Sequence, residues 1–249
     1  MDNIIKSFTV RASLYSDIWD NASSDNFKTI KLHKDVREHL ISIAKDFIES
    51  FGIDSFVIED ILFVGSLTNY NWSNYSDVDL HVVIDKSKLG TEPIVADEFF
   101  DAKKQNFNLK HDIKIKGYDV ELYAQDVNET LDSKGKYSVL FNKWVETPSI
   151  SDFELDKNSV IKKVKEFNKT LTSLEKMENT KEKLDKIDAF KEKIRKYRKN
   201  GLMGGGELSN ENLVFKYLRR SGFMEKLSDL KTNTTDSILS LENAELLPK

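Results

Sequence analysis

The sequence predicts a mixed α/β (α+β) protein in two parts, a small β-sheet domain over residues 1–152 and a helical domain over residues 153–249. Two observations support this division. Up to about residue 150, short apolar segments rich in β-branched residues alternate with helix-like segments, as in a sheet covered by helices. After about residue 155, apolar residues recur at three- and four-residue steps, which is typical of amphipathic helices.

Residues 34–51 predict the first long helix of the sheet domain. Asp35 is a candidate N-cap, and Gly52 lies where the helix should end. Helical spacing connects the apolar residues Val36, Leu40, Ile43, Ala44 and Phe47.

The strands of the predicted sheet follow this helix. The segments 56–66 (FVIEDILFVGS) and 77–85 (DVDLHVVID) predict two neighbouring strands. A helix is expected over residues 92–108, with Pro93 in its first turn. Residues 111–126 (HDIKIKGYDVELYAQD) alternate as a strand or hairpin does, and residues 137–148 predict one more strand.

The helical domain begins with a predicted helical hairpin over residues 157–201 that turns near Asn179-Thr180 and ends at Gly201. The glycines at 204–206 predict a mobile connector. A further helix is expected over residues 211–223 with Ser209 as its cap, and the last segment is also expected to be helical.

Composition excludes several classes of protein. The chain has no cysteine, which excludes disulfide frameworks, cysteine-rich zinc sites and thiol catalysis. No apolar run is long enough to cross a bilayer, and the N-terminal segment lacks the basic and apolar regions of an export signal. We therefore expect a cytoplasmic protein without membrane insertion. Its formal net charge of −4 does not by itself indicate a nucleic-acid binder.

Three carboxylates form the most informative pattern. Asp77 and Asp79 share one face of their strand, because side chains at i and i+2 of a strand point the same way. Two carboxylates about 4 Å apart repel by roughly 4 kcal/mol at an effective dielectric of 20, so a cation should lie between them. Glu121 is a third acid in a neighbouring strand, on the same face as Asp119 and Tyr123. Oxygen ligands favour Mg²⁺ or Mn²⁺, and two such ions support phosphoryl transfer.

Gly65 and Ser66 precede the aspartates by about ten residues. Glycine allows close backbone approach to a phosphate. If residues 66–71 begin a helix, its free N–H groups and the Ser66 hydroxyl can bind phosphates. The pair is thus a candidate triphosphate site.

These residues together resemble the polymerase-β-type nucleotidyltransferase superfamily. Its pattern is Gly followed by Gly or Ser, a loop of about ten residues, Asp-apolar-Asp, and a distant third acid on a strand. Here this pattern reads Gly65, Ser66, Asp77, Asp79 and Glu121. More closely, three segments, residues 65–83, 111–126 and 211–220, resemble compact nucleotidyltransferases encoded by tailed phages.

The resemblance implies a minimal nucleotidyltransferase domain that transfers a nucleoside monophosphate from an NTP to a hydroxyl and releases pyrophosphate. It implies that Asp77 and Asp79 bind both metal ions, that Glu121 binds the one that activates the acceptor, and that Gly65 and Ser66 hold the triphosphate. Asp119 competes with Glu121 as the third acid. The acceptor stays open: an RNA 3′ end such as tRNA, a protein hydroxyl, a small molecule or a second nucleotide.

Two other functions compete with this reading. Three carboxylates and two metal ions also suit a nuclease, although the Gly-Ser phosphate site argues against one. A non-catalytic nucleotide- or RNA-binding module is the other alternative, and the complete set of acids argues against it.

Further residues have both functional and structural interpretations. His81 either contacts a phosphate or an acid, or is a partly buried hydrogen-bonded histidine; His111 is open in the same way. Lys216 and Arg220 share a helix face and could reach a triphosphate or an RNA backbone. The alternative RNA contacts are Arg195, Lys196, Arg198 and Lys199, and the loop aromatics that either stack on a base or pack as a lid are Tyr70, Trp72 and Tyr75.

Overall fold

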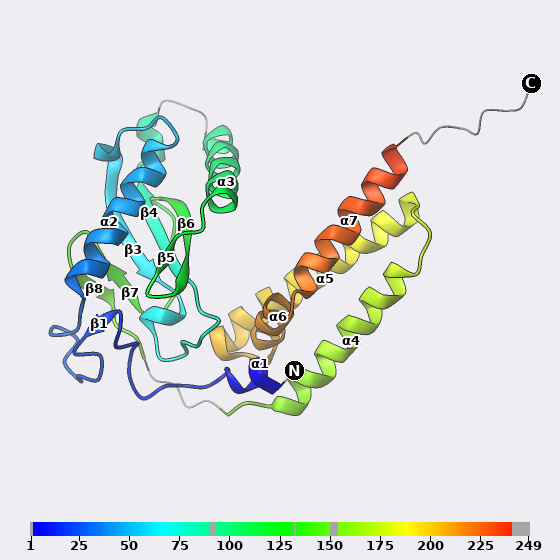
Figure 1. Ribbon diagram of the computed structural model, residues 1–249, viewed down its shortest axis with the longest axis horizontal. Helices are drawn as coiled ribbons and strands as arrows, with labels where there is room; N and C mark the ends of the chain where they lie inside the picture. Colours follow the sequence, from blue (N-terminus) through cyan, green and yellow to red (C-terminus); the bar gives the residue numbers. More distant parts are fainter. Residues whose placement is uncertain (1, 90–92, 132, 150–153, 241–249) are drawn as a thin grey trace, which may run out of the picture. The chain divides into compact units, whose positions relative to one another are not determined.

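The structure is a computed structural model that describes residues 2–89, 93–131, 133–149 and 154–240. The chain forms two compact units, each with its own hydrophobic core (Figure 1). The sheet unit comprises Thr9–Asp152, and the helical unit comprises Met1–Phe8 and Phe153–Lys249. The N-terminal segment thus differs from the sequence-based division: it belongs to the helical unit, because Ile5 and Phe8 are buried in that core.

A six-stranded sheet with the order β5-β6-β4-β3-β7-β8 is the centre of the sheet unit. Strands β4 and β6 are parallel, and every other neighbouring pair is antiparallel. The predicted neighbouring strands are confirmed as β3 and β4. The strands are β3 (Ile58–Val64), β4 (Val78–Ile84), β5 (Lys114–Ile115), β6 (Tyr118–Asp126), β7 (Lys136–Ser138) and β8 (Lys143–Glu146), and a separate two-stranded sheet pairs β1 (Trp19–Asp20) with β2 (Lys31–Leu32).

The two faces of the sheet differ in chemistry. On one face, Val78, Leu80, Val82 and Ile84 of β4 are fully buried in the core. Helices α2 (Lys34–Glu49) and α3 (Pro93–Lys110) contribute to the same core, and Figure 1 shows α3 beside β6. Because strand residues alternate, the intervening residues of β4 lie on the opposite face. We call this the polar face of the sheet.

Helix α2 confirms the predicted helix but not its cap. The N-cap position is His33, whose side chain makes no capping hydrogen bond. Asp35 lies in the first turn, where a carboxylate is favourable, and accepts a 2.7 Å hydrogen bond from Lys116 Nζ. That interaction holds the pKa of Asp35 below its usual value.

The prediction of one strand over residues 137–148 is wrong. The chain instead forms the β7–β8 hairpin, in which Asn142 has a φ of 53°. Asn tolerates this left-handed conformation better than most residues, and its side chain accepts a 2.7 Å hydrogen bond from the Tyr137 hydroxyl. Trp144 of β8 stacks on Trp19 with a centroid distance of 4.7 Å, which anchors the hairpin in the core.

The helical unit confirms the predicted hairpin and the Ser209 cap, which accepts from the backbone N–H of Asn212. The predicted end at Gly201 and the predicted glycine connector are wrong: α5 continues to Gly205 and stops at Gly206, where φ is 67°. A Cβ on Gly201 would collide with Glu211 of α6, so this glycine lets α5 and α6 pack closely at this position. The helices are α1 (Asp2–Lys6), α4 (Lys157–Glu175), α5 (Lys181–Gly205), α6 (Asn210–Arg220) and α7 (Phe223–Leu239).

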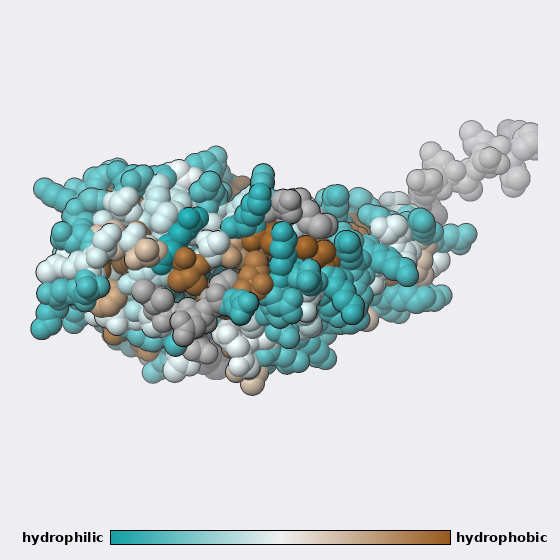
Figure 2. Space-filling model, turned by 90° about the horizontal axis from the view of Figure 1, so that it is seen from below, coloured by the Kyte–Doolittle hydropathy of each residue, from teal (hydrophilic) through white to brown (hydrophobic). Residues whose placement is uncertain are grey.

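Hydrophilic residues cover most of the face visible in Figure 2, and the mean hydropathy of the chain is −0.49. Among the described residues, no helix has the length and apolar character needed to cross a membrane.

The free edge of β6 is covered by α3. The side-chain amide of Asn108 donates to the carbonyl of Leu122 at 3.2 Å and accepts from its N–H at 3.4 Å. These two bonds satisfy backbone groups that would otherwise lie at an open sheet edge.

We expect Asn108→Ala to lower the free energy of unfolding by about 1–2 kcal/mol, because both backbone groups of a buried residue lose their partner. Urea unfolding followed by circular dichroism measures this. Asn106→Ala is the matched control, since Asn106 is an exposed asparagine of the same helix. Equal effects of the two substitutions would contradict the edge-covering role of Asn108.

Asp60 of β3 is a carboxylate on the polar face, and it provides a test of how stability depends on pH. Burial raises the pKa of Asp60, although hydrogen bonds from the Ser138 hydroxyl and the Ile61 N–H oppose the shift. The pKa of Asp60 is therefore higher in the folded than in the unfolded protein. Between these two pKa values the folded state binds more protons, so the free energy of unfolding falls as pH rises through the folded pKa.

Asp60→Asn keeps an oxygen that can accept both hydrogen bonds but removes the buried charge. The variant should therefore have a higher melting temperature than the wild type at pH 7, and the difference should shrink toward pH 4. Thermal melts at the two pH values measure this. A wild type that is more stable than the variant at pH 7 would show that the ionised carboxylate is favourable.

Candidate active site

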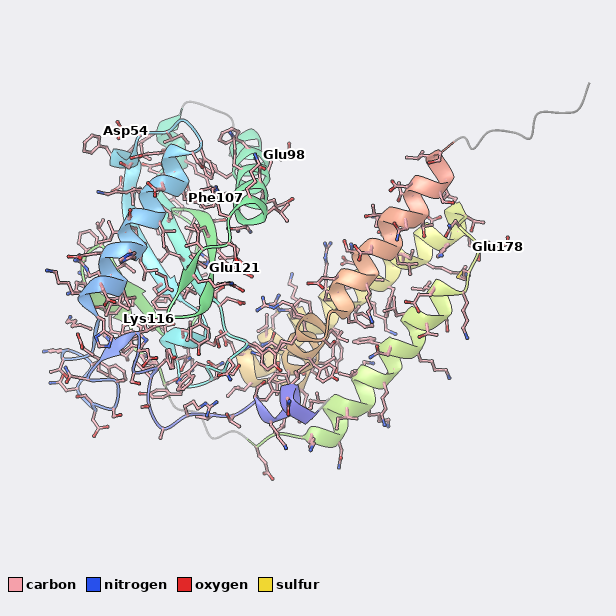
Figure 3. The ribbon with its side chains drawn as sticks, viewed as in Figure 1. Asp54, Glu98, Phe107, Lys116, Glu121 and Glu178 are labelled. Atoms are coloured by element: carbon pink, nitrogen blue, oxygen red, sulfur yellow. The ribbon has the colours of Figure 1, made fainter. Side chains whose placement is uncertain are left out.

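Two of the three predicted acids are direct neighbours in the sheet. Asp79 of β4 and Glu121 of β6 are register partners in the parallel pair, so both lie on the polar face. Neighbouring strands are about 4.8 Å apart, which brings the two α-carbons close. Asp77 directly precedes β4, and Figure 3 shows Glu121 on β6. Residues separated by more than forty positions are therefore brought to one place.

Gly65 makes room for the Asp79 carboxylate. Its backbone has φ 85° and ψ −159°, a region that only glycine adopts readily. A Cβ at this position would collide with Oδ2 of Asp79. The sequence predicted close approach of a phosphate to this glycine; the structure adds close approach of the aspartate.

The turn after Gly65 is not the helix expected from residue 66 onward. Ser66–Thr68 form a single 3₁₀ turn. The Ser66 hydroxyl donates to the Ser76 hydroxyl at 2.7 Å, and Ser76 also accepts from the backbone N–H of Ser73. The polar loop is therefore closed on itself just before Asp77, with Ser66 at one end.

Glu121 is oriented by a tyrosine that lies two residues further along the same face. The Tyr123 hydroxyl donates to Oε2 of Glu121 at 2.8 Å. The ring of Tyr123 stacks on His81 with a centroid distance of 4.7 Å, and Nζ of Lys104 lies 4.0 Å from the ring centroid. Alternation along β6 indicated Tyr123, whereas nothing in the helical pattern of α3 indicated Lys104.

His81 has the structural role that the sequence left open. Its Nδ1 lies 2.9 Å from Oε1 of Gln125, and Nε2 of Gln125 donates to the carbonyl of Glu129. The Gln125 oxygen is thus the acceptor, and His81 Nδ1 carries the proton. Burial lowers the pKa of His81 and so favours the neutral ring.

A groove of about 610 Å³ runs between α3 and β6 and includes Glu121 and Tyr123 in its wall. Lys104, Asn108 and His111 line it from the side of α3 and the segment that follows. His111 thus borders the groove, and its ring also packs on Phe107, 4.3 Å between centroids. The groove gives a ligand a path to Glu121.

Asp119 lies in the same groove but is held by a different partner. Its carboxylate binds Lys114, which also binds Asp112 at 2.8 Å. These two acids raise the pKa of Lys114. Because Asp119 is ion-paired and Glu121 is the register partner of Asp79, the geometry favours Glu121 as the third acid.

Among the described residues, no group of three or more His, Asp or Glu side chains is arranged to hold a metal ion. The hydrogen bond from Tyr123 directs one oxygen of Glu121 along its own strand. The donor set itself fits a hard divalent cation, since it consists of carboxylate oxygens on adjacent backbone positions. A rotation of these side chains is needed to make them converge.

The predicted basic residues lie in the helical unit, where several have partners. Lys216 pairs with Glu207 at 3.4 Å; burial lowers the pKa of Lys216 and Glu207 opposes that shift. Arg220 donates to the Ser7 hydroxyl at 2.9 Å and stacks on Phe8. A role of Lys216 and Arg220 in phosphate binding stays a prediction.

The alternative RNA contacts have partners in part. Arg198 donates to Asn212 and stacks on Phe215, and Lys196 pairs with Glu192 at 3.8 Å. No bond or ion pair of Arg195 or Lys199 is recorded in the described chain.

The loop aromatics support the packing interpretation for Trp72. Its indole N–H donates to the carbonyl of Ser13, and its ring contacts Tyr15 and the guanidinium of Arg11. Burial raises the pKa of Tyr70, which packs against the same core. Tyr75 is 37% exposed. Of the three, Tyr75 best fits a base-stacking role.

Comparisons with protein-family models, with curated proteins and with solved structures found no match for this chain.

We expect Gly65→Ala to destabilise the sheet unit by about 1–3 kcal/mol from backbone strain, with a further loss from the collision with Asp79. Gly52→Ala is the matched control, because Gly52 also has a positive φ (77°) but no atom within 4 Å of the added Cβ. Urea unfolding of both variants measures how much more the substitution costs at Gly65, where the collision and the ψ of −159° both contribute. If Gly65→Ala is no more destabilising than Gly52→Ala, the Asp79 carboxylate is not confined by Gly65.

Proposed function

We propose that the polar face of the sheet unit is the active site of a metal-dependent nucleotidyltransferase. In this reaction an acceptor hydroxyl attacks the α-phosphorus of an NTP. A new phosphate ester forms, the bond to the oxygen that bridges the α- and β-phosphates breaks, and pyrophosphate leaves. The hydroxyl proton passes to a carboxylate or to solvent.

The observation that carries the proposal is the placement of Asp79 and Glu121. They are register partners at the centre of the sheet, on the face opposite the core. Asp77 adds a third carboxylate directly before the strand, and Gly65 packs against Asp79. Each added carboxylate raises the repulsion between the acids, and a bound divalent cation would offset that repulsion.

The acids fit Mg²⁺ or Mn²⁺, which prefer carboxylate oxygens. Asp77, Asp79 and Glu121 would hold such ions, which neutralise the developing charge on the phosphate and activate the acceptor hydroxyl. Tyr123 is the positioning residue for Glu121: its hydroxyl restricts one carboxylate oxygen and leaves the other for a ligand.

The proposal assigns the NTP and the acceptor separate binding positions on the sheet unit. Gly65 and Ser66 are proposed to hold the triphosphate on its polar face. The further candidates that the sequence suggested, Lys216 and Arg220, belong to the helical unit. The groove along α3 reaches Glu121 and offers Lys104 as a cation and Asn108 and His111 as polar groups. An acceptor that enters this groove would present its hydroxyl beside Glu121.

The test is incubation of purified protein with each α-³²P-labelled NTP and Mg²⁺ or Mn²⁺, with and without cellular RNA and protein. Label should move to an acceptor. Asp77→Asn and Asp79→Asn should each reduce transfer at least about a hundredfold, because the lost ligand removes several kcal/mol of transition-state stabilisation.

Asp85→Asn is the control, since this acid follows the same strand and bonds Ser87 outside the polar-face cluster. Comparison of Glu121→Gln with Asp119→Asn identifies the third acid. Transfer that persists in both Asp77 and Asp79 variants would contradict the assignment, and metal-dependent shortening of RNA without label transfer would favour a nuclease.

A further inference from the structure

The two units of the chain carry opposite charge. The helical unit contains 22 Lys and Arg against 17 Asp and Glu, whereas the sheet unit contains 16 against 25. The net charge of the whole chain therefore does not reveal the excess of positive charge in the helical unit. The question is where on the helical unit this charge is available to a ligand.

Helix α4 presents a row of lysines opposite its buried side. The buried residues follow one another at steps of four and three. Four exposed lysines follow one another along α4 at steps of three, four and seven residues: Lys162, Lys165, Lys169 and Lys176. Thr172 divides the last step into three and four. At 100° per residue the four lysines occupy an arc of about 60° that points away from the buried residues, over a length of about 21 Å. We call these four residues the lysine ridge.

The ridge is exposed, and its ammonium groups have no partner among the described residues. All four side chains are exposed, and none forms a hydrogen bond or ion pair within the part of the chain that the structure describes. The nearby acid Glu166 does not neutralise them, because it binds Lys163 at 2.9 Å and Lys193 at 3.8 Å. Lys163 holds the pKa of Glu166 below its usual value.

The neighbouring helix α5 provides a comparison, because lysines on its outward face are ion-paired with acids of the same helix. There Lys181 pairs with Asp185, Lys186 with Glu182 and Lys196 with Glu192, all at i,i+4 spacing. Such pairs stabilise a helix and keep it soluble. The ridge on α4 has one acid at such a spacing, Glu166, and this acid pairs with Lys163 and Lys193 instead. Ion pairs that stabilise the helix therefore do not account for the ridge.

A pocket of about 380 Å³ adjoins the ridge, between α4 and the segment where α6 meets α7. Lys165 of the ridge and Lys226 of α7 both line it, and Asn168, Thr172 and Ser221 add polar groups. The Asn168 amide donates to the carbonyl of Val164, which leaves its oxygen as an acceptor. The lining also includes one acid, Glu175. The two lysines suit phosphate oxygens, and the Asn168 oxygen can accept a hydrogen bond from a sugar hydroxyl.

We propose that the lysine ridge of α4, together with the Lys165–Lys226 pocket, binds the sugar-phosphate backbone of a polynucleotide. If the proposed transfer reaction is correct, this polynucleotide is the acceptor. Its identification as the acceptor rests on the proposed function, whereas its binding to the ridge does not. Binding is independent of base sequence, because lysines read charge and not base edges. At the arginine-rich end of α5, by comparison, Arg198 and Lys196 have partners, whereas Arg195 and Lys199 form no bond or ion pair within the described residues.

The experiment measures binding of a fluorescein-labelled single-stranded RNA of about 20 nucleotides by anisotropy, without NTP, between 50 and 200 mM KCl. Four phosphate contacts predict a slope of log K against log salt of about −3. Replacement of the four ridge lysines by glutamine should remove most of this slope and weaken binding at 50 mM KCl at least tenfold.

The matched control replaces Lys181, Lys186, Lys193 and Lys231 by glutamine, which removes the same charge from lysines that are ion-paired. This variant should change the slope by less than about 1. Equal losses in the two variants would show a net-charge effect and overturn the ridge, as would unchanged binding in the ridge variant or no binding by the wild type. Melting curves of both variants verify the fold.

Two further arms separate the sources of the signal. DNA of the same sequence should bind similarly if only phosphates are read, whereas a preference for RNA places a 2′-hydroxyl contact in the pocket. Asp77→Asn should bind RNA like the wild type. Ridge-dependent binding without any transfer would overturn the proposed reaction and not the ridge; transfer to RNA at full rate in the ridge variant would overturn the ridge as acceptor site.

Discussion

The alternation of β4 is the constraint on which the sheet unit depends. Its even-numbered residues from Val78 to Ile84 are fully buried, and β4 is hydrogen-bonded on both sides, to β3 and β6. A shift of one residue in either register would expose four apolar side chains and bury Asp79 and His81. The hydrophobic effect on one face thus determines where the carboxylates of the other face lie.

The same constraint explains how much of the site was predictable. Period-two alternation assigned Asp79 and Glu121 to strand faces, and Gly65 was recognisable from its position after an apolar strand. The sequence also suggested that the strand of Glu121 neighbours that of the aspartates, but the parallel register of β4 and β6 was not readable, because parallel strands are connected by a long crossover that leaves no local pattern. Here α3 forms that crossover, and it also supplies Lys104 and Asn108, whose contacts depend on tertiary packing.

The errors in the helical and hairpin predictions have local causes. The β7–β8 turn uses Asn142 in place of the glycine that usually marks a hairpin, and the pattern therefore looked continuous. Gly201 looked like a helix end, but the structure places it inside α5, where its lack of a side chain permits contact with the segment before α6. Ile5 and Phe8 follow no long periodic pattern, and only the core of the helical unit shows where they belong.

The division of charge between the units connects the acids with the lysines. An acidic sheet unit attracts divalent cations and repels a polyanionic acceptor, so a protein that joins the two needs a separate basic surface. At 0.1 M salt, charges are screened beyond about 10 Å, and the overall charge of a unit matters less than cations that contact the ligand directly. A row of lysines over about 21 Å, each without an acidic partner, provides such contacts, whereas the ion-paired lysines of α5 do not. Under the proposed reaction, the lysines of α4 that have no partner among the described residues would supply the basic surface that the acidic sheet unit lacks.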